Sequence, residues 1–259
     1  MTFEFIRVRC DGPVGWLEYN RPPRNAAHEP MVREILSALQ TLEADPAVRV
    51  IAVGSALDDW FSVGAEMQVF DHMDQQGMAQ WADLVHEIVR VLRASAKPLL
   101  AAIHGTAVGG GLEVTYHCDV RFCADDARLG QPEISIGLIP PIGTTQSLAR
   151  LLGRSRAIRF LYDGEIIGAL QAMEIGLVDE LTPPEELRGL VQAYGEALAE
   201  KPPEALAAIR RTITAGMDLP FEEALALEHR AFEELGGTRN FKEGVRAFLE
   251  KRKPEWERE

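Results

Sequence analysis

Two glutamates of this sequence lie in apolar, glycine-containing segments, where a carboxylate indicates a chemical role. Glu113 lies two residues after a glycine run in the apolar segment 104–114, and Glu133 lies in the glycine-bounded segment 130–137. Such surroundings are unusual for an ordinary solvated charge. A pair of carboxylates beside backbone N–H donors is what proton transfer next to a carbonyl group requires.

The glycine run offers the first donor. Gly109-Gly110-Gly111 follows a predicted buried strand and precedes a helical stretch at 112–116, so the backbone there can approach a ligand closely and present unpaired N–H groups. Glu113 lies three residues after Gly110, and helical side chains lean toward the helix N-terminus, which predicts that Glu113 lies over the Gly110 N–H. The alternatives are a tight strand-to-helix crossing for the glycines and a solvated helix charge for Glu113.

A second donor is predicted at Ala65. A short strand ends at Gly64, and a turn begins at Ala65, whose N–H then lacks a partner. If the N–H groups of Ala65 and Gly110 converge, they form an oxyanion hole. Each donor of such a site contributes roughly 2.7 to 4 kcal/mol of transition-state stabilisation.

Composition excludes several classes of function. The chain has 27 basic and 40 acidic residues and a net charge of −13, which disfavours nucleic acid and anionic membranes as partners. Its N-terminal residues form an alternating charged pattern rather than a signal peptide, and no apolar run is long enough to span a membrane, so we expect a cytoplasmic protein. Three sparse cysteines indicate no disulfide framework. His117 and Cys118 have no second ligand pair at metal spacing, and we expect no metal site.

The elements that position these residues alternate between strand and helix up to about residue 145, which predicts an α/β fold with a largely parallel core. The remainder is predicted to be mainly helical. The expected strands span 3–9, 14–19, 48–53, 59–64, 99–103, 119–124 and 177–181. The expected helices span 29–44, 76–95, 112–116, 145–152, 154–162, 168–175, 184–200, 203–216, 220–235 and 238–250.

Several segments together resemble the crotonase (enoyl-CoA hydratase/isomerase) superfamily. Residues 97–114, with the glycine run and Glu113, are similar to its signature, and residues 61–66 resemble its first oxyanion-hole segment. Residues 20–25 resemble its early CoA-contacting loop, and residues 241–254 resemble its C-terminal helix. These motifs occur in the family's order over nearly the whole chain.

The resemblance implies a fold and an assembly. The fold is a crotonase-like spiral of ββα units, which we expect over residues 1–195, followed by a C-terminal helical trimerisation subdomain over residues 196–259. The implied assembly is a homotrimer or a dimer of trimers. The implied substrate is an acyl-CoA thioester, with no cofactor apart from the CoA that belongs to the substrate.

The resemblance also implies roles for particular residues. Glu113 and Glu133 match the two catalytic glutamates of family hydratases, and Ala65 and Gly110 match the oxyanion-hole donors. Glu113 is then the base that takes a proton from water, and Glu133 is the acid that protonates the α-carbon. The implied binding residues for substrate and CoA are Arg24, Ala26, Gly64, Glu66, Met67, Gln68 and Pro141.

Two alternative functions stay open at this point. The first is a double-bond isomerase or a β-dicarbonyl-CoA hydrolase on the same scaffold. The second is a non-enzymatic member that binds a CoA thioester or RNA, although the acidic balance disfavours RNA. Pro141 bears on this choice, because it replaces a glycine of the family pattern and removes a backbone N–H, which either alters the acyl pocket or merely rigidifies the loop. Basic residues 251–253 either meet CoA phosphates across a subunit boundary or form an ordinary charged helix end.

Overall fold

Two β-sheets form the body of the molecule over residues 3–257, which the computed structural model describes. The larger sheet has the strand order β1-β2-β3-β5-β7-β10, and the smaller has the order β4-β6-β8-β9. Only the pairs β1–β2 and β8–β9 are antiparallel. The strands are β1 (Ile6–Asp11), β2 (Val14–Tyr19), β3 (Val50–Ser55), β4 (Trp60–Ser62), β5 (Leu99–Ile103), β6 (Thr106–Val108), β7 (Val120–Ala124), β8 (Arg128–Gly130), β9 (Ile166–Gly168) and β10 (Glu180–Thr182).

Helices follow the strands in a repeating order, and each turn of the chain gives one strand to each sheet. The sequence β3, β4, α2 is followed by β5, β6, α3 and then by β7 and β8. This repeat is the ββα unit expected from the sequence. The helices are α1 (Glu29–Ala44), α2 (Gln75–Ala94), α3 (Gly110–Thr115), α4 (Thr144–Leu152), α5 (Arg154–Asp163), α6 (Ala169–Ile175), α7 (Pro184–Ala199), α8 (Pro203–Gly216), α9 (Phe221–Gly236) and α10 (Arg239–Glu250), with 3-10 turns η1 (Met67–Val69) and η2 (Pro132–Ile136).

Helices cover both faces of the larger sheet, as alternation along β2 shows. Trp16 faces α7, where its ring nitrogen donates to Gln192 (2.8 Å). Gly15 faces α1, because a β-carbon at residue 15 would lie 2.7 Å from a methyl group of Leu42. A strand buried on both faces is typical of a parallel sheet, and every residue of the central strand β5 is buried.

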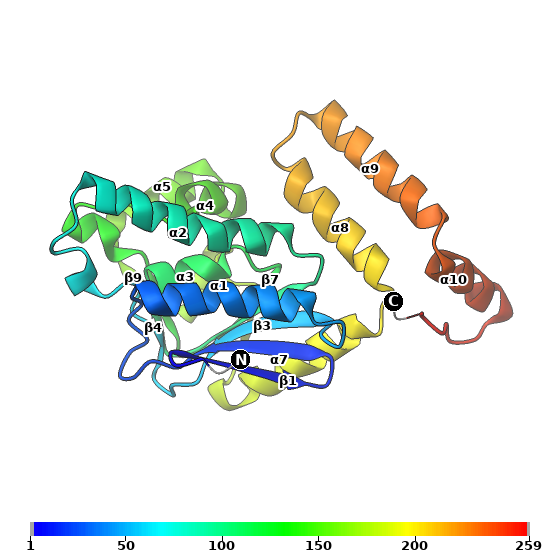
Figure 1. The fold of residues 1–259 in the computed structure, drawn as a ribbon, viewed down its shortest axis with the longest axis horizontal. Helices are drawn as coiled ribbons and strands as arrows, with labels where there is room; N and C mark the ends of the chain where they lie inside the picture. The colour runs from blue at the N-terminus through cyan, green and yellow to red at the C-terminus, as the bar shows by residue number, and fades with distance from the viewer. Residues whose placement is uncertain (1–2, 258–259) are drawn as a thin grey trace.

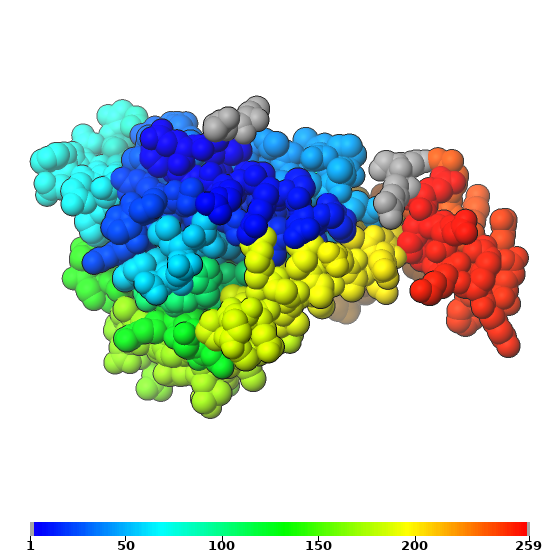
Figure 2. Space-filling model, turned by 90° about the horizontal axis from the view of Figure 1, so that it is seen from below, coloured from blue at the N-terminus to red at the C-terminus, as the bar shows by residue number. Residues whose placement is uncertain are grey.

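The C-terminal helices α8, α9 and α10 leave this body and form an arm (Figure 1). In the space-filling view the last residues, in red, make a separate lobe at one end of the molecule (Figure 2). The expected boundary between residues 195 and 196 falls inside α7, which lies on the sheet to its end at Ala199. The division of the chain into two domains at that point stays a prediction.

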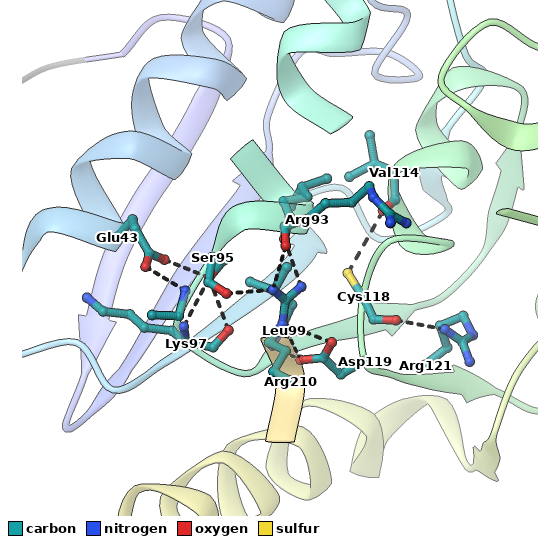
Figure 3. Close-up of polar contacts among 12 residues, drawn as sticks. Glu43, Arg93, Ser95, Lys97, Leu99, Val114, Cys118, Asp119, Arg121 and Arg210 are labelled. Carbon is teal, nitrogen blue, oxygen red and sulfur yellow. Dashed lines mark hydrogen bonds and ion pairs between the residues drawn. The ribbon is translucent and has the colours of Figure 1, made fainter. Parts of the chain in front are cut away.

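One buried arginine fastens the arm to the body. Arg210 of α8 donates from Nε to both carboxylate oxygens of Asp119, at 3.0 and 2.9 Å (Figure 3). Its two other nitrogens donate to backbone carbonyl oxygens at the end of α2, among them Leu92 (2.7 Å) and Ser95 (2.6 Å). A helix leaves its last carbonyl groups unpaired. Arg210 therefore donates both to the free carbonyl oxygens at the end of α2 and to the carboxylate of Asp119, which follows α3.

Candidate active site

The two predicted donor segments meet backbone to backbone. Gly64, two residues after the end of β4, has φ +80°, and Gly109, directly before α3, has φ +56°. A β-carbon at residue 64 would lie 3.1 Å from the amide nitrogen of Gly110, so a larger residue there would press on that nitrogen. Gly111 allows the same approach, because a β-carbon at residue 111 would lie 2.2 Å from Cβ of Ser62 on β4. The glycines therefore bring the segments into contact.

Unpaired backbone donors lie at this junction. The N–H of Ala65 and the N–H of Gly110 have no hydrogen-bond acceptor among residues 3–257. Gly110 is the first residue of α3, so no carbonyl of that helix reaches its N–H. The two donors expected from the sequence are thus available to a ligand.

Glu113 lies wholly buried beside these donors, with an exposed fraction of 0%. Its Oε2 accepts hydrogen bonds from the N–H of Ile142 (2.7 Å) and from the hydroxyl of Thr144 (2.6 Å). Its Oε1 is buried and has no hydrogen-bond partner in the described part of the chain, and a β-carbon at residue 110 would lie 3.8 Å from it. Burial, and secondly the charge of Glu133, raise the pKa of Glu113 to about 8, against the effect of the two hydrogen bonds. The alternative interpretation of Glu113 as a solvated helix charge is therefore excluded.

Glu133 sits in the first turn of η2 and faces the same glycines. A β-carbon at residue 109 would lie 2.9 Å from its Oε1. Burial raises the pKa of Glu133 to about 7. Both glutamates are therefore held in surroundings that favour the neutral form, with oxygens that face the Gly109-Gly110 backbone.

The side chain of Gln131 links Glu133 to Tyr116. When the Gln131 amide oxygen accepts from the Tyr116 hydroxyl (2.9 Å), its nitrogen donates to Oε2 of Glu133 at 3.0 Å, which suits an ionised carboxylate. This orientation pairs both ends of the amide, so Gln131 holds Glu133 as a donor and Tyr116 as an acceptor.

The titrations of the two glutamates are coupled. Since the charge of Glu133 raises the pKa of Glu113, the two sites do not ionise together readily. Below both pKa values neither carboxylate is charged, and above both neither carries a proton. Only the singly protonated pair contains one base and one acid.

The loop at residues 20–28 lies against the segment that carries Ala65. The N–H of Ala27 donates to the carbonyl of Gly64 (2.7 Å), and the N–H of Glu66 donates to the carbonyl of Ala27 (2.8 Å). The buried Asn25 fixes this loop, because its amide nitrogen donates to the carbonyl of Phe61 (2.9 Å) and its φ is +52°. The predicted binding residues of the two segments are thereby brought together.

The predicted binding residues differ in what holds their side chains. Arg24 is exposed, and its guanidinium lies 5.1 Å from the centre of the Trp60 ring. Glu66 pairs with Arg21 (2.9 Å), so its carboxylate is already engaged. The side chains of Met67 and Gln68 are exposed. Pro141 directly precedes Ile142, the residue whose N–H holds Glu113.

The basic residues 251–253 lie at the end of α10, on the arm and apart from α3 (Figure 1). Within one chain they do not join the glutamates. Arg252 is bound by Glu243 (2.6 Å) and Glu250 (2.7 Å). The alternative in which residues 251–253 meet CoA phosphates across a subunit boundary stays a prediction.

Three residues that hold the site were not expected from the sequence: Thr144, His117 and Gln131. Thr144 begins α4, and His117 follows the end of α3. Nothing in their sequence distance from Glu113 marks either residue as one that positions it. The signal that could have indicated Gln131 is its place two residues before Glu133 in the same apolar segment. His104, interpreted as a packed turn residue, has its Nε2 2.7 Å from the carbonyl oxygen of Leu57.

Among residues 3–257, no three His, Cys, Asp or Glu side chains come together in a way that could hold a metal ion. None of the helices in that range is long and apolar enough to cross a membrane. Cys118 and Cys123 are buried free thiols, and Cys10 is exposed and free.

Comparison with known proteins shows one family throughout. The family model described as enoyl-CoA hydratase/isomerase matches residues 11–259. The chain is 34% identical to a crotonyl-CoA hydratase from Syntrophomonas wolfei over 254 residues, which cover 98% of each protein. It is also 34% identical to a probable enoyl-CoA hydratase from Bacillus subtilis over 260 residues, covering 98% of this chain and 99% of the relative.

Solved structures agree with this result. The crystal structure of an enoyl-CoA hydratase from Bacillus anthracis superposes with a TM-score of 0.93 at 29% identity, covering 99% of this chain and 100% of that one. The crotonase-like fold expected from the sequence, with its ββα spiral and C-terminal helices, is thereby confirmed.

Proposed function

The chain belongs to the enoyl-CoA hydratase/isomerase family, and from that premise we propose that it is an enoyl-CoA hydratase, which adds water to a trans-2-enoyl-CoA thioester. The observation that carries the proposal is the pair Glu113 and Glu133, which share a proton beside two unpaired backbone N–H groups. Water addition needs a base and an acid at one site, and this pair supplies both. A double-bond shift can be performed by a single carboxylate that moves one proton.

The oxyanion hole is the first part of the proposed mechanism. The thioester carbonyl oxygen accepts hydrogen bonds from the N–H groups of Ala65 and Gly110. These donors stabilise the negative charge that reaches this oxygen when the β-carbon is attacked. They are fixed in place before the substrate binds, so they need no reorganisation during the reaction.

Proton transfer by the two glutamates is the second part. Ionised Glu113 takes a proton from water, the water oxygen bonds to the β-carbon, and the electron pair of the double bond passes to the thioester as an enolate. Protonated Glu133 then gives its proton to the α-carbon, the enolate collapses, and the product is a 3-hydroxyacyl-CoA. The pair ends with Glu113 protonated and Glu133 ionised, and one proton must return from Glu113 to Glu133 before the next turnover.

The two singly protonated states of the pair serve the two directions of the reaction. Burial raises the pKa of both glutamates, and their titration is coupled, so the shared proton belongs to the pair rather than to one carboxylate. The state with the proton on Glu113 is required for dehydration, in which Glu133 removes the α-proton and Glu113 protonates the leaving hydroxyl. Hydration uses the state with the proton on Glu133, and the two hydrogen bonds to Oε2 of Glu113 act toward that state because they stabilise the charge of Glu113.

Binding of the CoA part is proposed for the loop at residues 20–28 and the segment at residues 64–68, which hydrogen-bond to each other. The exposed guanidinium of Arg24 is suited to a phosphate group. We further propose that the reaction uses no cofactor apart from the CoA of the substrate, and that the protein is cytoplasmic.

The arm supports the proposal of a homotrimer or a dimer of trimers. Its helices expose large apolar side chains, including Phe232 at 78% and Phe248 at 83% exposure. An apolar groove of about 450 Å³ lies along α10. Contiguous apolar surface of this kind is typical of subunit interfaces. Light scattering coupled to size-exclusion chromatography tests this, and a monomer would contradict it.

The test of function is the loss of enoyl-thioester absorbance when the protein is mixed with crotonyl-CoA. The same assay carried out in ¹⁸O-labelled water separates hydration from isomerisation, because hydration places one labelled oxygen in the product and isomerisation places none. Absence of label in any product across short, long and cyclic enoyl-CoAs would contradict the hydratase proposal. Activity that persists after chelation and dialysis supports the absence of a cofactor.

A further inference from the structure

Glu113 is held on one side only. Both hydrogen bonds that it accepts go to Oε2, and both come from a stretch of three residues: the N–H of Ile142 at 2.7 Å and the hydroxyl of Thr144 at 2.6 Å. Oε1 has no partner among the described residues, although it is buried. Thr144 has an exposed fraction of 0%, so its hydroxyl has no contact with solvent.

His117 holds the same stretch from the opposite direction. Its Nε2 lies 2.8 Å from the carbonyl oxygen of Ile142. A carbonyl oxygen only accepts, so Nε2 carries the hydrogen and donates. Between the two contacts, Gly143 has φ +66°, and a β-carbon there would lie 3.3 Å from Cε1 of His117. The peptide units of residue 142 are thus bound on both sides, by Glu113 at the N–H and by His117 at the C=O.

From this geometry we propose that Thr144 and His117 are positioning residues that fix Oε2 of Glu113 and leave Oε1 directed at the reacting atoms. Thr144 acts by its own hydrogen bond, and His117 acts through Ile142. This inference rests on the proposed function only for the identity of the reaction. The way in which Thr144 and His117 hold the Glu113 carboxylate does not depend on which reaction takes place.

The consequence for Glu113 is chemical as well as geometric. Two donors on Oε2 stabilise the ionised carboxylate, which is the form a base needs, and the Ile142 N–H cannot accept a hydrogen bond from a proton on that oxygen. A proton taken up on Oε1, beside Gly110, leaves both hydrogen bonds to Oε2 in place. The groups that oppose the charge are Glu133 and the buried environment, while Tyr116 couples to both glutamates.

His117 is suited to this role because it stays neutral. Burial lowers the pKa of His117, and the nearby cations Arg93 and Arg210 act in the same direction, against the hydrogen bond to Ile142. A neutral ring that donates from Nε2 adds no charge beside Glu113. It keeps the same tautomer through the pH range in which the glutamates titrate.

Substitution of Thr144 is the first test. Thr144→Val removes the hydroxyl at nearly constant volume, and we expect kcat to fall about tenfold while KM changes less than about twofold, since the residue does not touch the substrate. The alkaline limb of the pH–rate profile should move up by about one pH unit, because Glu113 loses a donor that favours its charge. Thr144→Ser should restore both values. Thr145→Val, next to it and without a contact to Glu113, is the matched control.

Substitution of His117 is the second test. His117→Phe should shift the alkaline limb in the same direction by a smaller amount, because Ile142 loses its fixed position but keeps its N–H. His104→Phe is the matched control, since His104 also lies against a backbone carbonyl (Leu57) but has no contact with residues 142–144. Equal pH profiles for His117→Phe and His104→Phe would remove His117 from the proposal.

A titration without turnover separates the inference from the proposed function. In the Glu133→Gln background Glu113 titrates alone, and its carboxyl carbon can be followed by NMR after ¹³C labelling of glutamate. Adding Thr144→Val to that background should raise the midpoint by about one pH unit. An unchanged midpoint overturns the positioning role whether or not the protein hydrates enoyl-CoA. A raised midpoint in a protein without hydratase activity supports the positioning role and contradicts only the proposed reaction.

Discussion

Two carboxylates, six residues apart in the chain, differ in burial and in the groups that bind them: Glu113 is wholly buried, whereas the Asp119 side chain is about one third exposed. Asp119 is bound through both oxygens: Arg210 donates to Oδ1 (3.0 Å) and Oδ2 (2.9 Å), and the N–H of Leu99 donates to Oδ2 (2.8 Å). Glu113 receives two neutral donors on one oxygen and nothing on the other. A cation accompanies Asp119, whereas a second carboxylate, Glu133, accompanies Glu113.

The difference separates a carboxylate that holds the structure from one that is available for chemistry. Burial raises the pKa of both groups, but Arg210 opposes the rise at Asp119 and Glu133 adds to it at Glu113. An unpartnered oxygen and a raised pKa cost stability and are expected where a proton must be moved. A fully bound ion pair is expected where two elements must be joined.

The largest expected effect is on catalysis at Glu113. Glu113→Gln keeps the shape and the acceptor oxygen but removes the base, and we expect kcat to fall by about 10² to 10⁴. Glu133→Gln should cause a loss of similar size. Crotonyl-CoA turnover, measured by absorbance, gives both values. Near-normal rates in both variants would contradict the two-carboxylate mechanism.

The same variant should not cost stability. Because the pKa of Glu113 is raised in the folded protein, its contribution to stability is fully present below its unfolded pKa and is lost as pH rises through about 8. Glu113→Gln should therefore gain about 1 to 3 kcal/mol of unfolding free energy over wild type between pH 5 and pH 8. Denaturant unfolding at both pH values measures this gain. A loss at pH 8 would place Glu113 with Asp119 as a structural group.

Arg210 should show the reverse pattern. Arg210→Met leaves Asp119 without its cation and the buried carbonyl oxygens at the end of α2 without their donor, and we expect a loss of about 2 to 3 kcal/mol. Denaturant unfolding at a fixed protein concentration measures it. Arg211→Met is the matched control, because Arg211 forms an exposed pair with Glu234 and should cost less than about 1 kcal/mol. Equal losses in the two variants would contradict the anchoring role.

The pH dependence of the rate is a smaller effect, about tenfold per pH unit outside the optimum. Only the singly protonated glutamate pair is active, so kcat/KM should form a bell with limbs near the pKa values of about 7 and about 8. Hydration and dehydration should share one bell, because the ratio of the two singly protonated states does not depend on pH. Initial rates in both directions from pH 5 to 10 test this. A single plateau above pH 6 would contradict a shared proton.

Much of this arrangement could be predicted from local sequence. The glycines predicted close backbone approach, the helical spacing placed Glu113 near Gly110, and the apolar surroundings predicted its burial. The longer elements were predicted within a few residues, since burial on both faces of β5 and amphipathic helices leave clear patterns.

What could not be predicted depends on contacts across distant segments. Strands β6, β8 and β9 have three residues each, too few for a period of two to be recognised, and they exist because neighbouring strands pair with them. Thr144 and His117 reach Glu113 or its loop only after folding, and no spacing rule links them. The pairing of Asp119 with Arg210 spans 91 residues and could not be predicted for the same reason.

The smallest expected effect concerns Pro141, whose missing N–H raised the question of altered chemistry. The donor that holds Glu113 is the N–H of Ile142, so an N–H at residue 141 is not needed for that contact. Pro141→Ala should therefore change kcat/KM less than about threefold, and should lower the unfolding free energy by about 0.4 to 1 kcal/mol because the unfolded chain gains freedom. Steady-state rates and denaturant unfolding measure the two quantities. A tenfold increase in kcat/KM would contradict this expectation, because it would show that an N–H at residue 141 takes part in holding the attacking water. The groups that bind Glu113 would then not be enough to explain how the active site differs from the structural carboxylate Asp119.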